Sequence, residues 1–218
     1  SRLSCTAVSG NPTMMMPGPM VNGPDRLTRG GRLALGLRLA EATRLTLGLD
    51  TQANDHTIRK TANAWTMPVE NMARNDDGRF KNSALFAELE HPFTGKDRLV
   101  AGLRADRWHA EDPRAVVAIS MMANVANPTF NHERDETLSS GFLRYEREVS
   151  AGSTFYAGVG HAERFPDYWE AISKESLATA SAFDTRAEKT TQLDLGWMKQ
   201  TGSVLASVSF FYGQVKDF

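Results

Sequence analysis

Only one cysteine, Cys5, occurs among the 218 residues of the chain. A single cysteine cannot form an internal disulfide bond, and without a partner it cannot build a zinc site from paired thiolates. An excess of one charge is missing as well, because 25 basic side chains are balanced by 26 acidic ones. Proteins that bind nucleic acid through its phosphates usually carry a clear positive excess, so we expect no nucleic-acid partner.

Long apolar runs are also absent from the sequence. Hydrophobic residues make up 41% of the chain, the mean hydropathy is -0.39, and no stretch approaches the roughly 18 consecutive apolar residues of a membrane-spanning helix. A transmembrane β-strand needs only roughly 9 to 11 residues and is apolar on one face. The composition therefore excludes helical spans and leaves a β-barrel open.

The usual fingerprints of catalytic sites are missing too. No two of the five histidines are four residues apart and none belongs to an HExxH motif, so a zinc hydrolase is not indicated. The sequence also lacks a Gly-x-Ser-x-Gly motif, a P-loop and a dinucleotide fingerprint. We therefore expect a protein that is not an enzyme and holds no cofactor.

What the sequence does contain is alternation with a period of two. Leucines alternate over 33–39 and again over 45–49, across a short gap, which predicts a hairpin. Three further pairs of segments repeat this pattern, namely 85–89 with 99–105, 141–145 with 155–159, and 193–197 with 204–210. We predict an all-β, antiparallel up-and-down meander of about eight strands in four hairpins over residues 29–215, preceded by an external loop at 1–28.

The connections between the predicted strands alternate between short and long. Turns within hairpins are a few residues, whereas the chain runs from about 60 to 79, 110 to 133 and 164 to 185 between hairpins. Loops beyond about 12 to 15 residues are uncommon in compact domains, but short turns at one end and long loops at the other are typical of outer-membrane barrels. A complete eight-stranded structural barrel and a soluble β-sandwich binding module remain alternatives.

The predicted inward positions argue that these strands are part of a larger transmembrane β-barrel. A barrel of eight strands must fill its lumen with its own inward side chains. The inward set includes six glycines, namely Gly36, Gly48, Gly102, Gly158, Gly160 and Gly196. The outward set should be exposed on a convex, lipid-facing surface and comprises Leu35, Leu37, Leu47, Leu103 and Leu195. The concave surface should carry Arg38, Glu90, Arg104 and Asp194.

Aromatic residues fall mostly near the predicted strand ends, where amphipathic rings can lie at the lipid headgroups. The set is Trp108, Phe155, Tyr156, Tyr168, Trp169, Trp197, Phe210 and Tyr212. One segment, GHAERFPDYWE at 160–170, combines a strand end with Arg164, then Phe165 and Pro166, then Glu170. Because proline cannot donate to a strand ladder, we expect Pro166 to end the pairing at the barrel rim, with Tyr168 and Trp169 beside it.

This segment resembles the late-barrel motif of TonB-dependent outer-membrane receptors. Its sequence is most similar to that of the copper receptors among them. GGRLALGLRL and NSALFAELEHPF also resemble barrel strands of that subgroup. The resemblance implies the outer membrane of a Gram-negative bacterium, contact with its lipid, and uptake of copper or of another metal chelate or siderophore. It also implies coupling to TonB through a plug domain, which we do not find in this chain and for which the inward glycines would leave room.

Sulfur-bearing residues are the candidate ligands for copper. The copper subgroup is associated with Cys-x-x-x-Met and His-x-Met motifs, and neither spacing occurs here. Thioether and thiolate sulfur favour Cu(I), although methionine also fills irregular apolar gaps. We expect at most weak recruiting ligands at the external end, namely Cys5, Met14, Met15, Met16, Met20, Met121 and Met122, with Met67 and Met72 nearby.

Overall fold

A computed structural model describes residues 2–4, 7–9, 19–120, 123–172 and 181–217 of the chain. The long strands are β3 (Met20–Arg38), β4 (Arg44–Thr61), β5 (Asn75–Pro92), β6 (Asp97–Asp112), β9 (His132–Ser150), β10 (Ser153–Arg164), β11 (Glu188–Thr201) and β12 (Val204–Lys216). The short elements are β1 (Arg2–Ser4), β2 (Ala7–Ser9), η1 (Val69–Asn71), β7 (Val116–Ser120), β8 (Ala123–Ala126) and α1 (Tyr168–Ile172). The fold is therefore almost entirely β.

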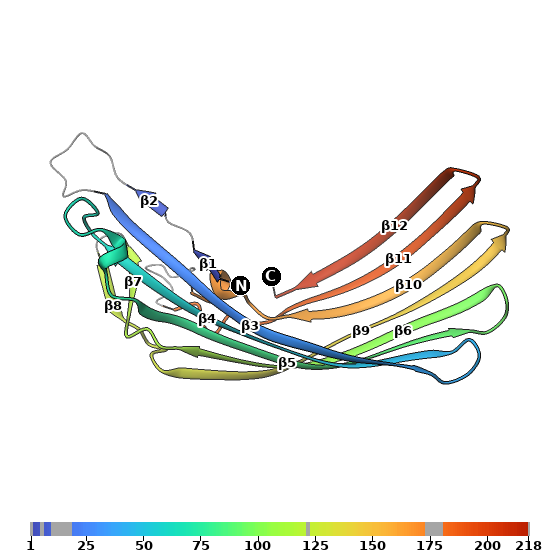
Figure 1. Cartoon of the computed structure of the whole chain (residues 1–218), viewed down its shortest axis with the longest axis horizontal. Helices are drawn as coiled ribbons and strands as arrows, with labels where there is room; N and C mark the ends of the chain where they lie inside the picture. The colour runs from blue at the N-terminus through green and yellow to red at the C-terminus, as the bar shows by residue number, and fades with distance from the viewer. Residues whose placement is uncertain (1, 5–6, 10–18, 121–122, 173–180, 218) are drawn as a thin grey trace.

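The long strands form one antiparallel meander, as the alternation predicts. Each pairs with the next in the order β3-β4-β5-β6-β9-β10-β11-β12, while β1 and β2 pair with the other edge of β3. β7 and β8 form a separate hairpin in the connection between β6 and β9. Figure 1 shows the sheet curved into an open trough, with the short turns at one end and the long connections at the other.

The expected external loop at 1–28 is wrong where the structure describes strands, because β1 and β2 pair with β3 and β3 itself already begins at Met20. Residues 21–28 pair with the far end of β4, where Val21 lies opposite Thr61. β3 has 19 residues, more than the roughly 9 to 11 that cross a bilayer. The part of a strand beyond the lipid has no reason to alternate apolar and polar residues, so the leucine pattern reveals only the lipid-facing part.

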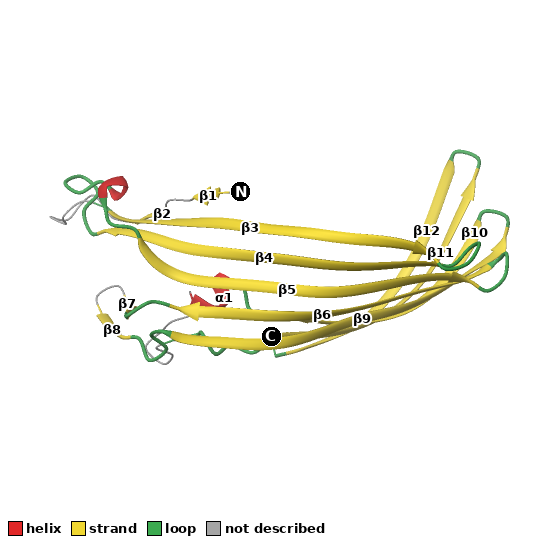
Figure 2. Cartoon of the chain, turned by 60° about the horizontal axis from the view of Figure 1, so that its bottom comes forward, coloured by secondary structure: helices red, strands yellow, loops and turns green. Residues whose placement is uncertain are grey.

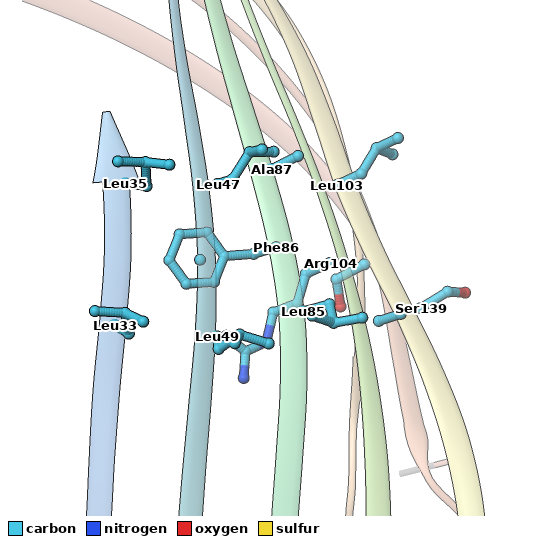
Figure 3. A pocket seen from close by; sticks show the side chains of 13 residues that line it. Leu33, Leu35, Leu47, Leu49, Leu85, Phe86, Ala87, Leu103, Arg104 and Ser139 are labelled. Atoms are coloured by element: carbon cyan, nitrogen blue, oxygen red, sulfur yellow. The ribbon is translucent and has the colours of Figure 1, made fainter. Parts of the chain in front are cut away.

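The outward leucines are exposed on one face of the sheet. Leu35 is 57% exposed and Leu103 is 73% exposed. Figure 3 shows Leu35, Leu47, Ala87 and Leu103 in one cross-strand row from β3 to β6, while Leu33, Leu49 and Leu85 make a second row. Because these leucines are exposed and not interdigitated with a second sheet of the described residues, the soluble sandwich is wrong.

The inward glycines do not all leave open space. At three of them, a Cβ atom would lie 2.1 to 2.3 Å from the aromatic ring of the residue directly opposite on the next strand. The opposed pairs are Gly48 with Phe86, Gly102 with Phe142, and Gly196 with Tyr156. Part of the space that we expected to be left for a plug is thus filled by rings of the sheet itself.

The buried core lies at the long-connection end, on the face opposite the leucines. Its members are Phe80, Trp108, Ala110, Tyr168, Ala171, Ile172 and Phe183. Figure 2 shows α1 beside β5 and β6, the strands that supply the first three of these residues. α1 has only five residues, and the described part of the chain contains no helix with the length and apolar character needed to cross a membrane.

Candidate functional site

The family-motif segment forms a tight corner between β10 and α1. β10 ends at Arg164, and α1 begins at Tyr168 after Pro166. The Glu170 N–H donates to Oδ1 of Asp167, and the Asp167 N–H donates to Oε2 of Glu170, each at 2.9 Å. This reciprocal arrangement is a capping box, which satisfies backbone donors that the first turn of a helix leaves free. The sequence therefore ends a strand and starts a helix within a few residues.

Arg164 holds this corner together. Its Nη1 and Nη2 atoms donate to the two carboxylate oxygens of Glu170 at 2.9 Å each, and Nη2 also donates to Oε2 of Glu188 at 2.9 Å. Glu188 is the first residue of β11. A bidentate guanidinium–carboxylate pair is geometrically specific, so Arg164 joins the end of β10, the helix α1 and the start of β11.

The two aromatic residues of the corner that we expected at headgroups differ in their surroundings. Tyr168 is buried, its ring is stacked on His56 with centroids 4.0 Å apart, and its hydroxyl donates to the buried Asp77. Trp169 is 55% exposed. The headgroup position is thus wrong for Tyr168, because the corner turns its ring towards β4 and β5, where a carboxylate accepts the hydroxyl. It is also wrong for Trp108, which is 4% exposed in the core.

The connection between β6 and β9 is built around a buried carboxylate. Asp112 is fully buried and accepts hydrogen bonds from Arg114 at 2.7 and 2.8 Å, from Asn127 at 2.9 Å and from Thr129 at 2.8 Å. A buried charge is stable only when it is paired and hydrogen-bonded. These bonds meet that condition and fix both ends of the segment that carries the β7–β8 hairpin.

The same connection is joined to the segment that follows β10. Nη1 of Arg114 donates to the carbonyl of Ile172 at 3.3 Å, and the hydroxyls of Thr129 and Ser181 are 2.7 Å apart. At the start of β9, Arg134 donates to the carbonyls of Phe183 and Thr185 at 3.0 and 2.7 Å. The connection between β6 and β9 and the connection between β10 and β11 are thus held together by hydrogen bonds. Local sequence patterns could not reveal it, because Thr129 and Ser181 are 52 residues apart.

Most of the candidate sulfur ligands, Cys5, Met14, Met15, Met16, Met121 and Met122, lie outside the described residues. Met20 is 46% exposed at the start of β3, and Met67 is 47% exposed in the connection between β4 and β5. That connection approaches β3, because the Ala64 N–H donates to the Pro19 carbonyl at 3.0 Å. Among the described residues, no group of three or more His, Cys, Asp or Glu side chains could hold a metal ion.

Further along the concave face, the wall is polar. Arg104 donates to Asp50 at 2.7 and 2.9 Å and to Asp106 at 2.7 Å. Asn82 donates to the same Asp106 at 2.7 Å. Alternation predicts Arg104 on this face, but its partner Asp50 comes from β4, 54 residues away. A charged wall behind a leucine surface suits a water-filled or protein-filled lumen surrounded by lipid.

Comparison with known proteins agrees with this geometry. The family model described as TonB dependent receptor-like, β-barrel, matches residues 6–218 of the chain. The solved copper transporter OprC is 37% identical over 100% of this chain, with a TM-score of 0.89, and the chain covers 35% of OprC. A comparison with curated proteins found no match.

Iron and heme receptors share the fold at lower identity. The Neisseria meningitidis iron transporter FrpB is 16% identical over 91% of this chain (TM-score 0.61), and the chain covers 30% of it. The Serratia marcescens hemophore receptor HasR is 17% identical over 92% of this chain (TM-score 0.65), and the chain covers 34% of it. The chain thus spans about a third of these receptors. It belongs to the β-barrel family of TonB-dependent receptors, which are outer-membrane proteins of Gram-negative bacteria.

Proposed function

We propose that this chain is part of the barrel wall of an outer-membrane transporter that takes up copper. The observation that carries the proposal is the 37% identity to the copper transporter OprC over the whole chain. The iron transporter FrpB and the hemophore receptor HasR are 16% and 17% identical to it, a level that supports the shared fold and says nothing about the ligand. The function is transport, without a catalytic step.

In this function the two faces of the sheet have separate tasks. The leucine face contacts the acyl chains of the outer membrane, because its side chains are apolar and exposed. The polar face, with Arg104 between Asp50 and Asp106, surrounds the transport path. Energy reaches the barrel from TonB through a plug domain outside this chain. The outer membrane of a Gram-negative bacterium is the proposed location.

The external end captures the metal ion. Met20 and Met67 are exposed at the long-connection end, and thioether sulfur is a soft ligand that suits Cu(I). Together with Cys5, Met14, Met15, Met16, Met121 and Met122, they would form a weak recruiting shell. The family-motif residues Arg164, Phe165, Pro166 and Glu170 position the neighbouring connection and do not bind metal themselves.

The alternative ligand is an iron chelate, such as a siderophore. It is suggested by the fold shared with the iron transporter FrpB (TM-score 0.61), which at 16% identity supports the common architecture and says nothing about the ligand. A chelate receptor recognises the organic shell of the complex, so sulfur ligands would contribute little. Methionine substitution should therefore lower uptake of copper but leave uptake of a chelate nearly unchanged.

The experiment expresses the intact receptor in a Gram-negative host that lacks copper receptors, with and without functional TonB. Cell-associated copper at limiting external concentration should rise only when both receptor and TonB are present. Growth on ferric siderophores as sole iron source serves as the parallel measurement. TonB-dependent iron supply without copper accumulation would reject copper and favour the chelate.

A further inference from the structure

Two arginines face each other at the short-turn end of the first hairpin. Arg38 is the last residue of β3, Arg44 is the first of β4, and the two are directly opposite in register. Arg38 shares its strand alternation with Arg32, whose guanidinium lies 4.4 Å from the centroid of the Phe86 ring on the concave face. Both Arg38 and Arg44 are exposed. Two positive charges therefore occupy adjacent positions on the inner wall.

Like charges directly opposite each other destabilise a strand pair. Several other arginines of the concave face are paired with carboxylates, namely Arg98 with Glu146, Arg104 with Asp50, Arg134 with Glu136, and Arg164 with Glu170. Arg38 and Arg44 form no ion pair with any residue in the described part of the chain. Glu90, directly opposite Arg44, is instead 3.9 Å from Arg98.

The face of the sheet on which the pair lies restricts the source of a counter-ion. Leu37 and Leu45, the sequence neighbours of the two arginines, are opposite each other on the convex face, and Leu37 is 38% exposed there. The arginines thus lie behind the leucine surface, with the sheet between them and the lipid. A group in the lumen reaches the two arginines directly, whereas a lipid phosphate would have to pass around the turn between β3 and β4, so a lipid phosphate is a poor partner.

We propose that Arg38 and Arg44 together bind a carboxylate side chain on a polypeptide segment held inside the curve of the sheet. Guanidinium groups offer several N–H donors in a planar fork that matches a carboxylate. Two such forks on adjacent strands would clamp one Asp or Glu and remove the repulsion between them. The proposal rests on the proposed function, in which this sheet is the wall of a closed barrel with protein in its lumen.

Zero-length cross-linking tests the clamp in the intact receptor. Arg38→Lys and Arg44→Lys each place a primary amine that carbodiimide couples to a carboxylate in contact, and mass spectrometry identifies the joined peptides. The matched control is Arg29→Lys, because Arg29 is exposed on the convex face of the same strand. We expect residue 38 or 44, but not 29, to be joined to an Asp or Glu outside the sheet. Coupling only to Glu88 or Glu90 of β5, or no coupling, would overturn the clamp.

A second measurement follows retention of the interior segment by limited proteolysis. The double variant Arg38→Gln/Arg44→Gln should raise the rate of cleavage of that segment about tenfold, which corresponds to about 1.4 kcal/mol, because both guanidinium groups are exposed and solvent weakens their ion pairs. Arg29→Gln should leave the rate unchanged. Equal rates in the double variant and the unaltered receptor would contradict the clamp. If the receptor formed no closed, membrane-inserted barrel, the proposed function would fail with it; a closed barrel without the effect overturns the clamp alone.

Discussion

The ring of Phe165 lies parallel to the indole of Trp108, with centroids 4.4 Å apart and an angle of 8° between the planes. Phe165 follows the last residue of β10 directly, whereas Trp108 belongs to β6. The stacked pair thus fastens the segment after β10 to a strand that is not its neighbour in the sheet. It is the contact by which the family motif folds over the concave face.

Substituting Phe165 by alanine should loosen this segment. The change removes the stacked ring and leaves a cavity against Trp108, which we expect to cost about 2 kcal/mol of local stability, since Phe165 is only partly buried. Hydrogen exchange of the α1 amides measures the loss as faster exchange. Trp65→Ala is the control, because Trp65 is 73% exposed in the connection between β4 and β5. Unchanged α1 exchange in the Phe165 variant would show that the stack does not hold the segment.

Replacing Arg164 by glutamine should separate α1 from the start of β11. The variant loses the hydrogen bonds to Glu170 and Glu188, but the Arg164 side chain is 49% exposed, so solvent screening limits the cost to about 1 kcal/mol. Exchange of the α1 amides should accelerate about fivefold. Arg186→Gln, at a side chain that is 83% exposed, should have no effect, and an equal response of both variants would contradict the role of Arg164.

Two glycines of the concave face should tolerate alanine very differently. At Gly48 a Cβ atom would lie 2.1 Å from the Phe86 ring, whereas at Gly36 nothing lies within 4 Å. Gly48→Ala must displace the ring and should cost about 1 to 3 kcal/mol. Gly36→Ala should be close to neutral. Urea unfolding of the receptor in lipid vesicles compares the midpoints, and equal midpoints would mean that the ring moves freely.

Leu103→Arg tests the lipid-facing surface. Leu103 is 73% exposed on the convex face, so in water the change would be nearly harmless. In a bilayer, arginine near the midplane costs about 2 to 4 kcal/mol, and less towards an interface. Unfolding in vesicles should reveal this loss, while Arg107→Leu, further along the same face of β6, should not destabilise. If the variant were as stable as the unaltered receptor, Leu103 could not face the lipid core.

The recruiting methionines predict a change in copper uptake. Replacing Met14, Met15, Met16 and Met20 by leucine in the intact receptor keeps most of the apolar volume and removes the thioethers. Copper uptake at limiting concentration should fall while the amount of folded barrel stays constant. Immunoblotting of folded receptor in the outer membrane provides the control. Uptake equal to that of the unaltered receptor would leave these methionines as packing residues.

Alternation in the sequence was sufficient to predict the meander and its two faces. A period of two places every second residue on the same side of a strand, so Leu35 and Leu103 could be assigned to one apolar face without coordinates. The lengths of the connections and the family resemblance then identified that face as the lipid-facing one. The motif around Arg164 and Glu170 was identified by its resemblance to the receptor family, and the structure adds the ion pair between the two residues. Local spacing therefore predicted the eight long strands and the four short turns between them.

Only the tertiary structure decided where the connections lie. The stack of Phe165 on Trp108 and the bond from Tyr168 to Asp77 join residues of β5 and β6 to a segment that follows β10. The curvature of the sheet brings these elements together over the concave face. Neither a period nor a motif in the sequence predicts these contacts. Strand extensions such as residues 20–28 of β3 escaped prediction for a related reason. Backbone pairing beyond the lipid needs no apolar side chain, so it leaves no pattern in the sequence.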